Sequence, residues 1–597
     1  MRKNRWPLLI PGAFLLYLIA LLHLPQPRAD FDLNTFGALP ILSGGRIKPM
    51  DTMARTALLM LRGKQTFHQE DHSLSAIEWL LDVLYRPAKA DTYSVFQIDD
   101  PDVLGLLSIE QGNQRYFSFN ELKTHLALID NQATQAEANK PDQQDRFQRA
   151  IISLRQRLVL YQKLQSTLQL SGAENVTEEY RHYIQDLTPL YLSHMQTHGK
   201  KNKAGLVDLL REVERFKFLE EAAEFYPLAM NQGTGKETWV SVGRGLLDAL
   251  TVPAHADISF YAHLGDAWRA QNAPAFNQLL SAHAHARRKI YLEQLFNHVE
   301  PFYQSMLLYV LVLLLASLSW LGWSEPLRRS AFFLLLLSFV VHTVGLGARM
   351  WFQGRPPVTN LYSSAIFVGW VAVLLGIILE RLYRNGLGSA MSATIGFVTL
   401  IIAHHLAVQG DTLEMMRAVL DSNFWLATHV VTITVGYAAT FLSGFLAAAY
   451  LIRRTWDKKW NETTASHLER MTYGVVCFSL FFSFVGTILG GIWADQSWGR
   501  FWGWDPKENG ALMIVLWNAM VLHARVGGFA RRDAIMVMAV FGNIVTAFSW
   551  FGVNMLGIGL HSYGFMDKAF SWLVVFSVLQ LGLMSLVILP QRFRRRR

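Results

Sequence analysis

The segment WADQSWGRFWGWDPKENG, from Trp493 to Gly510, concentrates large aromatic rings between two apolar runs. Tryptophans gather at membrane surfaces because their rings are apolar with one polar edge, so an interfacial belt is one interpretation. The other is a binding platform, in which glycines let the backbone bend while rings present flat faces to a planar ligand. Trp498, Trp502 and Trp504 are the candidate ligand contacts. The local pattern leaves both interpretations open.

The polar end of the segment has a structural explanation. Asp505 is suited to cap the next helix, with Pro506 at its first position and Glu508 at its third, as in a capping box. Two cations, Arg500 and Lys507, remain beside the rings. They either bind acidic ligand groups such as haem propionates or are solvated loop charges, and both alternatives stay open.

Two histidines flank this segment in the sequence and are candidate iron ligands. His429 opens an apolar run in FWLATHVVTITVGYA, and His561 lies in GLHSYG near the end of the chain. Ionisable residues within or at the edge of membrane helices are unfavourable there and usually functional. Two imidazoles on opposite sides of an aromatic platform can ligate one haem iron. A single histidine favours a structural role, but the set around one loop predicts a haem site.

His523 is expected at a different place. It follows Glu508 on the same expected helix, and the rise along that helix separates the two by about 22 Å. His342 lies in the middle of an apolar run and is left without a role. The remaining histidines near apolar runs lie at helix ends and are not assigned as ligands: His23, His404 and His405.

Long apolar runs are the elements that position these residues. Roughly 18 or more mostly apolar residues predict a membrane-spanning helix, because a helix satisfies its backbone groups internally. The first run, 6–24, follows basic residues and lacks a small-residue cleavage site, which predicts an uncleaved anchor. The others are 303–323, 331–348, 361–380, 391–408, 429–452, 472–491, 509–525, 533–551 and 569–589. The expected fold is an all-α polytopic membrane protein with about ten transmembrane helices.

The basic residues predict the orientation, because they stay on the cytoplasmic side of a membrane. With both termini inside, the inner loops carry Arg328–Arg329, Arg381 with Arg384, Arg453–Arg454 with Lys458–Lys459, Arg525 with Arg531–Arg532, and the tail Arg592 to Arg597. The tryptophan loop and residues 25–300 then lie outside. The net charge of +9 therefore reflects topology, and nucleic-acid binding is not expected.

Three parts follow along the chain: an anchor at 1–24, a mainly helical extracytoplasmic domain at 25–300, and a nine-helix membrane domain at 301–597. In the second part, apolar residues at helical spacing predict an amphipathic helix from Asp145, and TWVSVG near 238 predicts a strand. The segment SGGRIKPMDTMAR, from Ser43, predicts a turn followed by a helix capped at Asp51. The alternative interpretation is that its basic pair binds an acidic group or partner.

The segment WGRFWGWDPKE, Trp498 to Glu508, matches the WGxxWxWDxKE loop of the haem-handling WWD superfamily at every fixed position. Within it the chain resembles the CcsA (ResC) family of system II cytochrome c synthase components, over about 300–597. The resemblance places His429 and His561 at the outer family histidines and His523 at the membrane histidine. PPVTNLYSS, ending at Ser364, departs from the family by having Ser where Glu is frequent.

The resemblance implies a haem lyase component that acts with a ResB/CcsB-type partner. Haem b, as substrate, would pass from an inner site with His523 and a partner ligand to an outer site with His429 and His561. There it would meet a CxxCH apocytochrome c at the outer face of a bacterial inner membrane. The only cysteine, Cys477, lies in an apolar run, so a separate thioredoxin-like thiol reductant is implied.

The protein's contribution would be mostly positioning, and no residue is assigned as catalytic. Two other functions remain as alternatives. One is a haem exporter or chaperone that delivers haem to another lyase. The other is a membrane electron carrier with b-type haem.

Overall fold

The computed structural model describes residues 6–594 except 25–29, 70–71, 111, 113, 141–142, 171–174, 190–191, 193–202, 232–236, 284–286, 414–420, 457–461 and 557–566. The chain forms two compact units. The membrane unit comprises Met1–Leu22, Val299–Ala407 and Met416–Arg597, and the amino-terminal unit comprises His23–His298 and Val408–Met415. The short segment Val408–Met415, between two helices of the membrane unit, thus folds with the amino-terminal unit.

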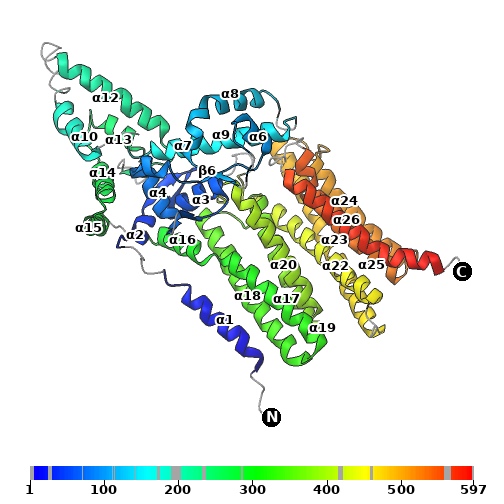
Figure 1. The fold of residues 1–597 in the computed structure, drawn as a ribbon. Helices are drawn as coiled ribbons and strands as arrows, with labels where there is room; N and C mark the ends of the chain where they lie inside the picture. The colour runs from blue at the N-terminus through cyan, green and yellow to red at the C-terminus, as the bar shows by residue number, and fades with distance from the viewer. Residues whose placement is uncertain are drawn as a thin grey trace. The chain divides into compact units, whose positions relative to one another are not determined.

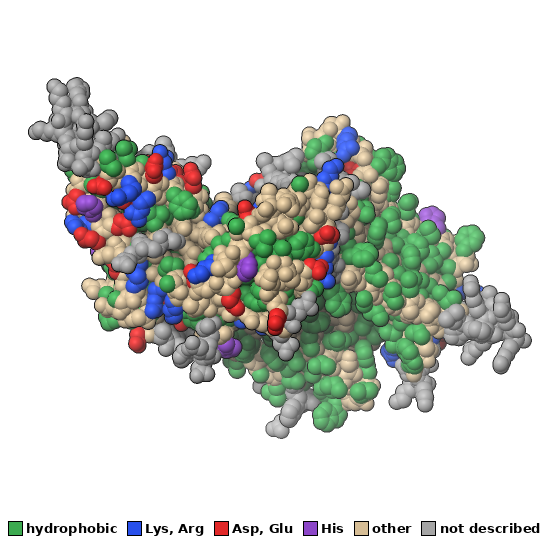
Figure 2. Space-filling view, turned by 45° about the horizontal axis from the view of Figure 1, so that its top comes forward, with side chains coloured by type: hydrophobic (Ala, Val, Ile, Leu, Met, Phe, Trp, Pro, Cys, Tyr) green, Lys and Arg blue, Asp and Glu red, His purple; other side chains and the backbone are tan. Residues whose placement is uncertain are grey.

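Long apolar helices make up the membrane unit and lie side by side as a bundle (Figure 1). Its elements are α1 (Leu9–Ala20), α17 (Pro301–Leu321), α18 (Ser324–Gln353), α19 (Leu361–Tyr383), α20 (Leu387–Leu406), α21 (Asn423–Trp425), the π-helix η6 (Leu426–Val430), α22 (Val431–Trp456), α23 (Glu462–Trp498), α24 (Pro506–Val526), α25 (Arg532–Trp550), the 3-10 helix η7 (Gly552–Leu556) and α26 (Asp567–Arg594). Broad areas of hydrophobic side chains are visible in Figure 2, and exposed residues such as Leu314, Leu318, Phe481 and Phe484 belong to these helices.

Eight helices among the described residues are long and apolar enough to cross a membrane. They coincide with eight of the ten expected spans. The expected first and last spans fall on shorter apolar helices, Leu9–Ala20 and Phe570–Leu586. The expected all-α polytopic fold is confirmed, and the protein is a multi-pass membrane protein.

Small and polar residues allow the helices of the bundle to approach closely. A Cβ added at Gly436 of α22 would lie 2.3 Å from Ser483 Oγ of α23. Deeper in the bundle, Asn518 Nδ2 donates to Thr440 Oγ1 at 3.3 Å and to Ser479 Oγ at 3.2 Å. Lipid supplies no hydrophobic drive between helices, so close packing and interhelical hydrogen bonds of this kind hold such a bundle together.

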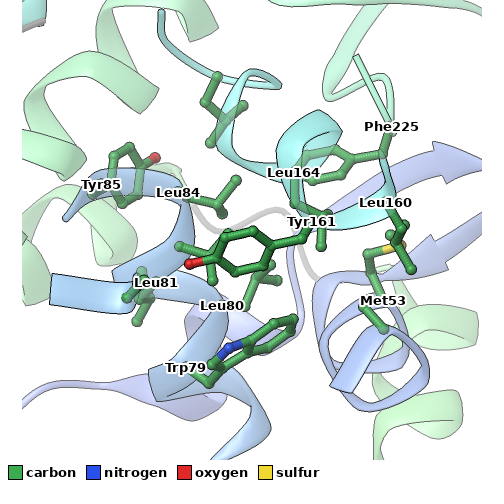
Figure 3. Packing of buried hydrophobic residues seen from close by; sticks show 14 of the residues in the cluster. Met53, Trp79, Leu80, Leu81, Leu84, Tyr85, Leu160, Tyr161, Leu164 and Phe225 are labelled. Atoms are coloured by element: carbon green, nitrogen blue, oxygen red, sulfur yellow. The ribbon is translucent and has the colours of Figure 1, made fainter. Parts of the chain in front are cut away.

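The amino-terminal unit is mainly helical, with four two-stranded antiparallel sheets among its described residues. Trp79, Leu80, Tyr161 and Phe225 are buried in its hydrophobic core (Figure 3). Its elements are α2 (Leu33–Gly37), β1 (Pro40–Ser43), β2 (Arg46–Pro49), α3 (Met50–Arg62), β3 (Thr66–Gln69), β4 (His72–Ser75), α4 (Ala76–Tyr85), α5 (Pro87–Ala90), β5 (Phe96–Gln97), α6 (Pro101–Leu106), β6 (Tyr116–Phe117), α7 (Phe119–Leu122), η2 (Lys123–His125), α8 (Leu126–Glu137), α9 (Arg146–Gln165), α10 (Val176–His182), η3 (Tyr183–Leu187), α12 (Lys203–Ala222), β7 (Leu228–Asn231), β8 (Glu237–Val240), α13 (Val242–Asp248), α14 (Ala256–Arg269), α15 (Ala273–His283) and α16 (Arg288–Val299).

Local sequence signals in this unit are mostly confirmed. Asp145 caps α9 through a capping box with Gln148, and the expected strand near 238 is β8. The expected cap at Asp51 is wrong. The helix α3 begins at Met50 with Pro49 in the cap position, two residues before the expected cap. Asp51 instead lies in the first turn and forms an ion pair with Arg55 one turn along.

The Gly-Gly turn before α3 joins β1 to β2. Gly44 and Gly45 both have positive φ, 58° and 79°, as a two-residue hairpin turn with the right twist requires. The hairpin carries the basic pair of the SGGRIKP segment into the interior of the unit, where Arg46 and Lys48 are largely buried.

The acidic partners of this basic pair come from the chain itself. Arg46 Nη1 lies 2.9 Å from Glu293 Oε1, and Arg46 Nη2 lies 3.0 Å from Asp411 Oδ2. Lys48 Nζ lies 3.0 Å from the same Asp411 oxygen. Burial alone would raise the pKa of Asp411, but the charges of Arg46 and Lys48 outweigh it and lower the pKa to about 2. An internal ion cluster therefore accounts for the basic pair.

Candidate functional site

A cavity of about 190 Å³ lies within the membrane unit, where sequence-distant segments meet. The start of α19, the stretch from η6 into α22, and the end of α23 each supply part of its wall. The tryptophan loop, the start of α24, the end of α25, and η7 supply the rest. Four of the residues expected at a haem site line it: His429, Trp498, Trp502 and Lys507.

His429 lies in the π-helix η6, a single wide turn before α22. Single π-turns of this kind occur frequently at functional sites. Its Nδ1 lies 2.8 Å from the carbonyl oxygen of Gly486 on α23. Because a carbonyl only accepts hydrogen bonds, Nδ1 carries the proton, and in the neutral imidazole Nε2 then carries the lone pair. This is the tautomer in which Nε2 can act as a metal ligand.

Two tryptophans of the WGRFWGWDPKE segment contribute to the cavity wall, and the third does not. Trp498 and Trp502 line the cavity. Trp504 is 71 % exposed, and the edge of its ring meets Trp502 with the centroids 6.2 Å apart. The backbone of Trp504 adopts φ 57°, a left-handed conformation that is unfavourable for a bulky residue and that accumulates at functional sites.

Hydrogen bonds from the start of α24 hold this loop. Asp505 and Glu508 form the expected capping box, with Pro506 in the first turn of the helix. Glu508 Oε2 accepts from the backbone N–H of Asp505 at 3.1 Å and also from that of Gly503 at 2.8 Å. The capping residue therefore also fixes the bend that carries Trp502 and Trp504.

Lys507 has a partner that sequence reasoning did not foresee. Its ammonium donates to the carbonyl oxygens of Ser549 at 3.2 Å and Trp550 at 3.0 Å. These carbonyls end α25 and lack partners within that helix, so a cation is favourable there. Arg500 is exposed and lies outside the cavity wall, with its guanidinium close to Gly503.

The other predicted histidines are not brought to this cavity. His523 is exposed near the end of α24, where its Nδ1 donates to the carbonyl oxygen of Ala519 at 2.8 Å. His523 and Glu508 lie on the one helix α24, so the rise of that helix separates them by about 22 Å. His561 lies outside the described residues. His342 is fully buried in α18, 2.9 Å from the hydroxyl of Tyr309.

The PPVTNLYSS segment forms another part of the cavity wall. Asn360 caps α19 in a capping box with Ser363, whose Oγ accepts from the backbone N–H of Asn360 at 2.9 Å. The usual third residue of such a box is Glu or Gln. Ser363, at the position where the family that the sequence resembles often has Glu, supplies a side-chain oxygen that accepts the same hydrogen bond. The next residue, Ser364, accepts from Trp550 Nε1 at 3.0 Å.

Several wall residues were missed by sequence reasoning. Trp493, Tyr437, Trp550 and Asn554 line the cavity, and the side-chain oxygen of Asn554 is buried without a hydrogen-bond partner among the described residues. A signal existed for Trp493, which shares one helix face with Gly490, the first glycine of TILGGIW. The other three arrive from α22, α25 and η7 by tertiary packing, which leaves no pattern in the local sequence.

The arrangement combines flat aromatic walls, one imidazole with a defined tautomer and few polar groups. Such walls suit a planar, largely apolar ligand. The volume of about 190 Å³ is below the roughly 300–1,000 Å³ of usual small-molecule pockets. A large planar ligand would therefore lie partly outside these walls or widen them.

Known proteins resemble the part of the chain that builds the cavity. The family described as cytochrome C assembly protein matches residues 358–561. A cytochrome c biogenesis protein CcsA from Synechococcus sp. (strain CC9902) is 33 % identical over 253 residues, 37 % of this chain and 82 % of the relative. The CcsA protein of Parasynechococcus marenigrum (strain WH8102) is 30 % identical over 288 residues, 43 % of this chain and 93 % of the relative.

A third relative, the CcsA protein of Synechococcus sp. (strain WH7803), is 31 % identical over 300 residues, again 43 % of this chain and 93 % of the relative. These matches cover most of each relative's length, so they extend well beyond the WGRFWGWDPKE segment. The expected family is confirmed, and its handling of haem follows in general terms. The chain belongs to the CcsA family of cytochrome c assembly proteins, and its function is cytochrome c biogenesis.

Proposed function

We propose that this protein binds haem at the cavity beside the tryptophan loop and presents it for covalent attachment to a CxxCH apocytochrome c. One observation carries the proposal: His429, held as the Nε2 ligand tautomer, shares a cavity wall with Trp498 and Trp502. Imidazole is a common axial ligand of haem iron, and aromatic faces suit the macrocycle. Membership of the CcsA family adds support, because cytochrome c assembly requires haem.

In this proposal haem b is the substrate, and His429 and His561 are its two axial ligands. Each apocytochrome thiol adds across one vinyl group of the haem. A carbon–sulfur bond forms, the thiol hydrogen ends on the other vinyl carbon, and no electrons are gained or lost. The thiols must be reduced beforehand, which assigns that step to a separate thioredoxin-like reductant. The protein orients the haem and excludes water, and no residue serves as a nucleophile.

A second haem position at His523 completes the proposed route. The separation along α24 makes His523 part of another site, to which a ResB/CcsB-type membrane partner contributes the second ligand. With the basic loops in the cytoplasm of a bacterial cell, His523 lies on the cytoplasmic side of the inner membrane. The tryptophan loop and the amino-terminal unit then face the periplasm, where the apocytochrome arrives.

Lys507 and Arg500 have different parts in the proposed site. The Lys507 ammonium already serves two backbone carbonyls, which favours a role in fixing the wall over a role in pairing with a propionate. The exposed Arg500 is the cation we assign to a haem propionate at the mouth of the site. Trp504 would meet haem only in the part that extends beyond the cavity wall.

The test is purification of the full chain from haem-replete cells with its associated proteins, followed by absorption spectra of wild type, His429→Ala and His561→Ala. We expect low-spin six-coordinate haem in the wild type, and in both variants a smaller amount of haem that is high-spin, together with loss of cytochrome c maturation. Unchanged haem loading and maturation in both variants would refute the proposal.

The same preparations distinguish the alternatives. Haem that becomes covalently bound to a coexpressed CxxCH substrate supports the synthase. Haem that leaves without thioether formation unless another lyase is added supports an exporter or chaperone. A b-type haem that stays bound and cycles reversibly in a redox titration supports an electron carrier.

A further inference from the structure

One face of α23 contacts the His429 ring. Gly486, Gly490 and Trp493 are four and three residues apart, the spacing that places side chains on the same helix face. All three contact His429 or its hydrogen-bonding nitrogen. Gly490 and Trp493, like His429, also line the cavity.

Each of the three restricts a different freedom of the imidazole. The carbonyl oxygen of Gly486 accepts from Nδ1 at 2.8 Å and so selects the tautomer. The ring of Trp493 lies 5.8 Å from the imidazole centroid at 60°, an edge contact that limits rotation of the ring. At Gly490 the imidazole lies directly against the helix backbone. A Cβ added there would lie 2.6 Å from Cε1, 3.0 Å from Nδ1 and 3.2 Å from Nε2 of His429.

Space, and not backbone conformation, explains the glycine at 490. The residue lies within the regular helix α23, where glycine is less favourable than alanine by about 1 kcal/mol. The three heavy atoms nearest to the hypothetical Cβ all belong to the His429 ring. Any side chain at 490 therefore displaces the imidazole or separates η6 from α23.

A second close contact, at Gly486, lies between α23 and α22. A Cβ at Gly486 would lie 2.8 Å from the backbone N and Cα of Ile433 in α22. Glycine at 486 therefore allows the backbones to approach, and glycine at 490 leaves the space that the imidazole occupies.

We propose that Gly490, together with Gly486 and Trp493, is a positioning residue that sets where the Nε2 of His429 meets the haem iron. This inference rests on the proposed function, in which His429 is an axial ligand. Gly490 lines the cavity but has no side chain that could ligate the iron. It acts by leaving the space in which the imidazole lies directly against the backbone of α23.

The test compares Gly490→Ala with Gly474→Ala in the full-length protein. Gly474 lies on the same helix, and a Cβ there meets nothing within 4 Å, so it controls for the chemical change itself. We expect Gly490→Ala to lower haem affinity roughly 10–100-fold, the range for disturbed support of a histidine ligand. The ferric haem that remains should shift from six-coordinate low-spin to high-spin, as in His429→Ala. Gly474→Ala should keep the wild-type spectrum.

A double variant separates positioning from helix packing. In a His429→Ala background the imidazole is absent, so adding Gly490→Ala should change neither haem content nor thermal unfolding further. An equal effect of Gly490→Ala with and without His429 would overturn the inference and assign the glycine to packing alone. A wild-type spectrum in Gly490→Ala would overturn it as well. Failure of the proposed function gives a different result, because His429→Ala itself would then leave the haem content and spectrum unchanged.

Discussion

Replacing Asp411 by asparagine is expected to destabilise the amino-terminal unit by removing one charge from its buried ion cluster. Asp411 faces two cations, with Arg46 Nη2 and Lys48 Nζ each 3.0 Å from its Oδ2. Glu293 pairs with Arg46 on the other side, and that pair remains after the substitution. Asparagine keeps the shape of the side chain, so the change isolates the charge.

The magnitude follows from the pKa of Asp411. Burial would raise this pKa, but Arg46 and Lys48 lower it from 3.8 to about 2. At 1.36 kcal/mol per pKa unit, this difference corresponds to about 2–3 kcal/mol of folding free energy. The figure lies at the lower edge of the about 3–5 kcal/mol observed when one partner of a buried pair is removed. Arg46 keeps Glu293 as a partner, which explains the smaller loss.

The stabilising contribution of Asp411 decreases as the pH falls. A depressed carboxyl pKa stabilises the folded state above the unfolded-state value near 3.8 and loses that contribution as the pH falls toward 2. The stability difference between wild type and Asp411→Asn should therefore be constant from pH 7 to about 5 and shrink below pH 4.

Thermal unfolding of the purified full chain, with hydrogen exchange to locate the melting unit, measures the effect. For a unit of this size about 2–3 kcal/mol corresponds to a decrease in Tm of roughly 5–10 °C. Glu237→Gln, which breaks the partly exposed pair with Arg287, is the control and should cost less than about 1 kcal/mol. Equal unfolding of wild type and Asp411→Asn at pH 7 would refute the reasoning, because it would mean that the cluster contributes no net stability.

Three further predictions concern the membrane unit. The double variant Trp498→Ala/Trp502→Ala should reduce the haem retained, measured by absorption spectra, far more than Trp504→Ala. Equal losses would mean that Trp504 also contacts the haem. Lys507→Met should destabilise the end of α25 by about 1–3 kcal/mol, because charge-assisted hydrogen bonds to two carbonyls are lost. Hydrogen exchange of the last α25 amides should become faster, and unchanged exchange would contradict this role of Lys507. Ser363→Ala should lower the free energy of unfolding by about 1 kcal/mol through loss of the α19 capping box, whereas Ser363→Glu should retain the box and the stability. Equal melting temperatures of the two variants would contradict the role of Ser363 in the cap.

The helix-start signals of the tryptophan loop were predictable because they are local. Asp505, Pro506 and Glu508 act on backbone groups within a few residues of themselves, so their types and spacing suffice. The cap expected at Asp51 failed for the same kind of reason. Pro49 took the cap position two residues earlier, and boundaries are the part of a helix that local patterns define least well.

The fate of charged residues was not predictable from spacing. The basic pair in SGGRIKP finds its acids at Glu293 and Asp411, which are hundreds of residues away in the chain. Lys507 binds the carbonyls that end α25, and those groups carry no side-chain signature. In both cases the partner is a product of tertiary packing, so a charged residue in the sequence indicates a need for a partner without identifying it.

Sequence alone determined the class of this protein. The length of its apolar runs predicted a multi-pass helical membrane protein, since only helices and closed barrels satisfy the backbone in lipid, and WGRFWGWDPKE placed it in its family. The tertiary structure decided how those residues are used. It divided the loop tryptophans between a cavity wall and an exposed position, and it set the His429 ring against Gly490. The place of the His429 ring depends on how closely η6 and α22 approach α23, a distance that arises only when the helices pack.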